Sequence, residues 1–106
     1  MINNSQQKFQ NLPGWEIVSF GLEDIESGKH ETIKALLVYM AASRLCEIGF
    51  DVPKFPFSED PFQIKVMIFQ KLSENYPDEH NQFNAMQQRL AKFCDFAERI
   101  THQSSN

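Results

Sequence analysis

The chain has 106 residues, of which 42% are hydrophobic and 23% are charged, and its formal net charge is −4. A chain of this length falls within the usual size of one domain and can bury a core without disulfides or metals. The composition excludes general intrinsic disorder. The acidic balance argues against nucleic-acid binding, which depends on clustered Lys and Arg. We therefore expect one globular domain without a nucleic-acid partner.

The first eleven residues are polar and lack the charged-then-apolar order of a secretion signal. No apolar run in the chain approaches the roughly 18 residues that cross a bilayer. We therefore expect a cytoplasmic protein without membrane contact. Residues 1–11 and 103–106 are predicted to be flexible termini around a single helical domain at 12–102.

The two cysteines, Cys46 and Cys94, stand far apart in the sequence. They lack the paired spacing of a zinc site or a redox motif. We expect both to be reduced, buried thiols, and we assign no metal and no cofactor.

The first predicted helix covers 13–27. Pro13 suits an early helical position, and Gly28 suits the left-handed residue that follows a helix. Gly21 lies in the middle and weakens the helix by about 1 kcal/mol relative to Ala, unless another helix crosses there and needs the space. The apolar residues recur at spacings of three and four, which places them on one face. These residues are Trp15, Val18, Leu22 and Ile25.

The second predicted helix covers 30–48 and ends at Gly49. Its apolar surface is wider than a single stripe, which indicates a central position in the domain. Arg44 falls within the apolar stripe, where we expect it to form a structural ion pair with an acid such as Glu23 or Glu47.

The segment 50–59 carries Pro53 and Pro56, which interrupt the helical pattern and favour extended backbone. It is unusually apolar for a connection between helices. It is therefore predicted either to fold back over the core, the more common outcome, or to present aromatic side chains to another chain. Its apolar residues are Phe50, Val52, Phe55 and Phe57.

The third predicted helix covers 60–75, because Asp60 is a good N-cap and Pro61 suits the first helical position. Pro77 ends it. Two apolar faces lie side by side on this helix. One consists of Ile64, Met67, Ile68 and Leu72, and the adjacent one of Phe62, Val66 and Phe69.

The fourth predicted helix covers 78–101 and is the longest. Its apolar residues alternate at three and four positions, the spacing of a heptad seam. This seam begins with Phe83, Met86, Leu90 and Phe93. Together the four helices predict an all-α, compact, four-helix bundle-like domain with a Pro- and Phe-rich connector between the second and third helices.

A polar cluster occupies the start of the fourth predicted helix. Its members are Asp78, Glu79, His80, Asn81, Asn84, Gln87 and Gln88. The candidate polar site within it is His80, Asn84, Gln87 and Gln88. A histidine that titrates near neutral pH could act there as a general base. The more ordinary interpretation is a capped helix start with a solvated face, because Asp78 and Glu79 suit the positive end of the helix dipole. No nucleophile, metal motif or second carboxylate stands at helical spacing from the histidine. We therefore assign no catalytic residue.

The leading hypothesis is a non-enzymatic protein–protein interaction module, either a homodimer or a subunit of a larger complex. The absence of a catalytic motif and the surplus of aromatic residues favour it. The expected interaction surface combines the connector with the seam of the last helix. Its residues are Phe50, Val52, Phe55, Phe57, Phe83, Met86, Leu90 and Phe93.

Two alternatives remain open at this point. One is a small-ligand-binding or enzymatic domain with a pocket near His80, lined also by Trp15, Tyr39 and Tyr76. The other is an antitoxin-like or immunity-like regulatory protein, whose acidic charge would meet a basic target.

Overall fold

The computed structural model describes residues 4–58 and 60–104, and these contain helices and no strand. The prediction of an all-helical, bundle-like domain is confirmed, but the count of four helices is wrong. The described residues form a short 3₁₀-helix and five α-helices. They are η1 (Asn4–Phe9), α1 (Trp15–Glu26), α2 (Ile33–Met40), α3 (Ala42–Ile48), α4 (Pro61–Asn75) and α5 (Glu79–Ser104).

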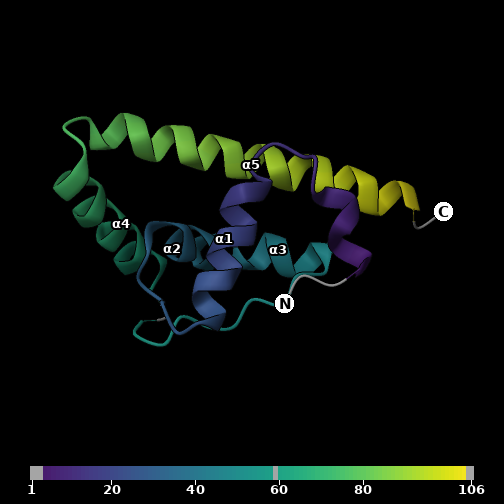
Figure 1. The fold of residues 1–106 in the computed structure, drawn as a ribbon, viewed down its shortest axis with the longest axis horizontal. Coiled ribbons are helices and arrows are strands. Elements are labelled where there is room, and N and C mark those ends of the chain that lie inside the picture. Colours follow the sequence, from purple (N-terminus) through teal and green to yellow (C-terminus); the bar gives the residue numbers. More distant parts are fainter. Residues whose placement is uncertain (1–3, 59, 105–106) are drawn as a thin grey trace.

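The longest helix, α5, runs along the long axis of the molecule, and α4 turns back beneath one end of it (Figure 1). The shorter helices lie on the same side of α5 as α4 does. Helix α2 packs against α1 and α4, whereas α3 packs against α5. Because α1 crosses under α5 instead of running alongside it, the bundle is irregular (Figure 1).

The predicted helix 30–48 is two helices, separated at Ala41. This residue has φ −95° and ψ 13°, and its N–H is shared between the carbonyl oxygens of Leu37 and Val38, both at 3.1 Å. The change in direction lets α2 contact α4 while α3 contacts α5. The sequence contains neither Gly nor Pro between residues 33 and 48, so it carries no local signal for the break.

The predicted helix ends agree with the structure where a capping residue defines them. The Asp60 carboxylate accepts a hydrogen bond from the N–H of Phe62 at 3.0 Å, and Pro61 is the first residue of α4. Gly28 and Gly49 have positive φ and follow α1 and α3. These ends depend on interactions within one helical turn, which sequence patterns capture well.

Gly21 lies where α2 crosses α1. A Cβ atom at this position would lie 2.4 Å from Cγ2 of Val38 and 2.6 Å from the carbonyl oxygen of Lys34. Another helix therefore does cross at Gly21, as the sequence required for a glycine in this helix, and it occupies the space of a side chain.

We predict that Gly21→Ala destabilises the protein by about 1–3 kcal/mol, although alanine is the better helix former, because the added methyl group overpacks the crossing. The free energy of unfolding in urea measures this effect. Glu23→Ala, at an exposed position of the same helix, serves as the control and should change stability little. A Gly21→Ala protein as stable as the wild type would contradict the close crossing.

Four aromatic rings from distant parts of the chain meet beside α5. Phe9 of η1 lies 5.7 Å from Phe50 and 6.0 Å from Phe93 between ring centroids. Trp15 of α1 lies 6.1 Å from Phe93 and 6.3 Å from Phe50. Phe9 is 1% exposed, so the segment predicted as a polar, flexible terminus contributes a core residue. Residues 1–3 and 105–106 of the predicted flexible ends lie outside the described residues.

We predict that Phe9→Ala lowers the free energy of unfolding by about 3 kcal/mol, because it removes a buried aromatic side chain from a packed cluster. Phe20→Ala provides a matched control, since Phe20 is 52% exposed on α1. The control should cost less than about 1 kcal/mol. Equal losses for the two variants would show that η1 does not hold Phe9 in the core.

Candidate interaction surface

The expected interaction surface is largely inside the molecule. Of its eight residues, Phe50, Phe55, Phe83, Leu90 and Phe93 are buried, and Val52 and Met86 are half-buried. Phe57 is 64% exposed. The physical reason is that the connector folds back on the core, while the seam of α5 packs against the chain's own shorter helices. Most of this set therefore serves as core in the structure.

The connector is held by a second aromatic cluster. Between ring centroids, Phe55 lies 5.0 Å from Tyr39 of α2, and Phe57 lies 5.4 Å from Phe55 and 6.2 Å from His30. The Tyr39 hydroxyl and Nδ1 of His30 are hydrogen-bonded at 2.8 Å. Burial raises the pKa of Tyr39 above its ordinary value. The ring of Phe55 is thus packed against α2, whereas Phe57 lies against Phe55 and His30.

Helix α4 has one buried side and one exposed apolar side. Ile64, Ile68 and Leu72 point into the core. On the other side Phe62 is 66% exposed, and Val66 and Phe69 are half-buried. We call the set Phe62, Val66, Phe69 and Ser73 the α4 outer face. The sequence predicted that its three apolar members form a second apolar face of the helix, and the structure shows that this face is exposed to solvent.

A shallow groove of about 400 Å³ lies along the α4 outer face. The Phe69 ring is part of its lining, and its centroid lies 4.7 Å from that of Phe83 and 4.9 Å from that of His80. Lys65 and Glu79 supply charges of opposite sign along its edge. An exposed apolar strip with charges at its rim is the usual composition of a protein-binding surface.

The predicted polar site does not form a pocket. His80, Asn84, Gln87 and Gln88 are all exposed on α5. The ring of His80 lies against Phe69 instead of facing a cavity.

The other side chains proposed to line this site are dispersed. Trp15 belongs to the cluster with Phe93, Tyr39 belongs to the cluster with Phe55, and Tyr76 is exposed at the end of α4. Within residues 4–58 and 60–104, no three His, Cys, Asp or Glu side chains are grouped as a metal site requires.

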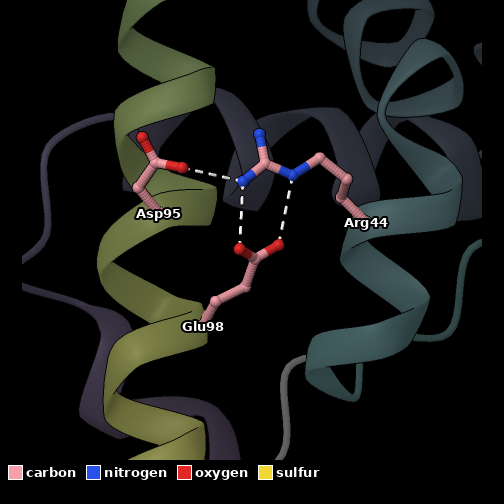
Figure 2. Close-up of polar contacts among 3 residues, drawn as sticks. All are labelled: Arg44, Asp95 and Glu98. Atoms are coloured by element: carbon pink, nitrogen blue, oxygen red, sulfur yellow. Dashed lines mark hydrogen bonds and ion pairs between the residues drawn. The ribbon is translucent and has the colours of Figure 1, made fainter.

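Arg44 forms the ion pair that connects α3 to α5 (Figure 2). Its Nε and one terminal nitrogen donate to the two carboxylate oxygens of Glu98, both at 3.1 Å, and that terminal nitrogen also donates to Asp95 at 2.9 Å. The hydrogen bonds that Arg44 donates to Glu98 and, second, to Asp95 raise the pKa of Arg44 above its ordinary value. The structural role predicted for Arg44 is confirmed, but the partners expected for it, Glu23 and Glu47, are wrong.

Beside this ion pair lies Cys94. The thiol is buried, and burial raises its pKa, an effect that the Arg44 guanidinium opposes. Cys46 is exposed, so the expectation of burial is wrong for it, and both cysteines are free thiols. A small hollow of about 180 Å³ separates Cys94 and Leu90 of α5 from the break at Ala41. Its lining is mainly apolar and includes no pair of a nucleophile and a base, so the hollow has the character of a packing gap.

We predict that Glu98→Gln destabilises the protein by about 0.5–1 kcal/mol and Asp95→Asn by less than about 0.5 kcal/mol, because Glu98 binds Arg44 through two oxygens and Asp95 through one. Both values are modest because the Arg44 side chain is 41% exposed. Urea unfolding measures them, and both should shrink in about 1 M salt. Glu47→Gln, on the exposed side of α3, is the matched control. A larger effect of the control would contradict the assignment.

Comparison with known protein families, with curated proteins and with solved structures finds no match to this chain. Among the described residues, none of the helices combines the length and the apolar character that crossing a membrane requires.

Proposed function

We propose that this chain is a non-enzymatic interaction module that binds another protein through the α4 outer face. The observation that carries the proposal is the exposure of Phe62, at 66%, on a helix whose opposite side is packed into the core. Six of the twelve other aromatic side chains are buried, and Phe62 is the most exposed large hydrophobic side chain among the described residues. Covering one such side chain gains about 1.5–3 kcal/mol, which is the scale of an interface hot spot.

The surroundings of Phe62 support the same proposal. Val66 and Phe69 extend the apolar strip along the helix, and Lys65 and Glu79 lie at its edge. An apolar centre with a charged rim excludes water from the contact and orients the partner. Because α4 is fixed in the core by its buried side, the strip is held on a rigid element before binding.

A cytoplasmic location belongs to this proposal. Two free thiols, one of them exposed, are the state that a reducing compartment maintains. The enzymatic alternative has less support, because the described polar residues near His80 point to solvent instead of lining a common cavity.

Site-specific photo-crosslinking tests the proposal without knowledge of the partner. Phe62 is replaced by p-benzoylphenylalanine, and cells that express the protein are irradiated. We expect discrete adducts of higher mass, because the α4 outer face is covered in the cell. Phe20 provides the matched control, since it is exposed to a similar degree but lies on α1.

The position of the adducts decides the outcome. Adducts from position 62 with few or none from position 20 support the proposal. No adduct from position 62, or equal labelling from both positions, overturns it. Mass spectrometry of the adduct then identifies the bound protein.

A further inference from the structure

We propose that the protein bound to the α4 outer face is a second copy of this chain, with the two α4 helices antiparallel about a two-fold axis near Phe69. This inference rests on the proposed function, since it names the partner for the same surface. Three properties of the surface lead to it: the spacing of its residues, the placement of its charges, and the size of its side chains.

The spacing along α4 is that of a helix–helix seam. Phe62, Val66, Phe69 and Ser73 follow one another at four, three and four positions. Tyr76, the C-cap residue with extended backbone, follows three positions later at the end of the helix and is 38% exposed. Alternation of three and four is the pattern by which one helix packs along another at a small crossing angle. The face is therefore shaped for a helix.

Phe69 stands at the middle of this series, with two members on each side. An antiparallel second helix centred there places each Phe69 against its own copy. It also sets Val66 opposite Ser73 of the second copy, and Phe62 opposite Tyr76 of the second copy. Two of these contacts pair aromatic rings with each other, and the third pairs the larger Val66 with the smaller Ser73. The face is therefore complementary to itself, as a two-fold interface requires.

The charges at the groove select the antiparallel arrangement. Lys65 lies between Phe62 and Phe69 in the sequence, and its ammonium group is 5.6 Å from the centroid of the Phe83 ring. Ser73 and Glu79 both line the same groove. An antiparallel second copy brings its Lys65 to Ser73 and thus to Glu79, and the symmetry forms this pair twice. In a parallel copy, Lys65 of one chain would lie about two helical turns from Ser73 of the other, so this pair would not form.

The length of α4 limits the strength of this dimer. Its 15 residues extend about 22 Å, so two such helices bury less than a standard interface. The dimer is therefore expected to exchange with monomer, and sedimentation velocity must cover concentrations up to about 1 mM.

Charge reversal tests the partner and its orientation together. Lys65→Glu alone and Glu79→Lys alone should each weaken self-association about tenfold, because each homodimer then holds two like-charged pairs. An equimolar mixture of the two variants should associate nearly as strongly as the wild type. In the mixed dimer, one chain is negative at both positions and the other is positive at both, so each contact between positions 65 and 79 joins opposite charges. Lys29→Glu, in the turn after α1, is the matched control and should leave self-association unchanged.

The mixture also shows that the variants are folded, because misfolded chains would not recover when combined. Recovery in the mixture supports the antiparallel dimer. Weakening without recovery overturns the orientation, and a wild-type protein that stays monomeric throughout overturns self-association. In that case, crosslinking from position 62 to a different protein would leave the proposed function standing, whereas the absence of any adduct would remove both.

Discussion

The packing of Phe93 against three other aromatic rings joins distant parts of the chain. Phe9 belongs to η1, Trp15 is the first residue of α1, and Phe50 is the first residue of the connector after α3. Phe93 is fully buried among them. Because rings of this size contribute large apolar areas, their contact determines where the N-terminal segment, α1 and the connector lie relative to α5. The rest of the fold is built around that arrangement.

The break at Ala41 and the ion pair of Arg44 follow from the same arrangement. Once α2 lies across α1 at Gly21, a straight continuation of α2 would not follow α5. The bend directs α3 toward α5, where Arg44 reaches Glu98 and Asp95 (Figure 2). The packing of apolar surface thus determines the helix directions, and the partly exposed ion pair adds a modest amount to it.

The candidate site depends on which apolar surfaces are buried in the core and which remain exposed. The seam of α5 and two of the four apolar residues of the connector, Phe50 and Phe55, are buried in the core, although both segments had the composition of a binding surface. Phe62 of α4 remains at the surface because α2 and α5 already cover the opposite side of that helix. The candidate site therefore results from the packing, and its members belong to a face that periodicity alone marked as apolar without showing its exposure.

The sequence by itself determined the helical class and the helix ends formed by Asp60, Pro61 and Gly49, because these depend on groups within one turn of each other. Only the tertiary structure decided the break at Ala41 and the partners of Arg44, which lie 51 and 54 positions away. Contacts over such separations depend on how all the helices share one core. That competition for burial, which no local pattern records, also decides which apolar face of the molecule is left open to solvent.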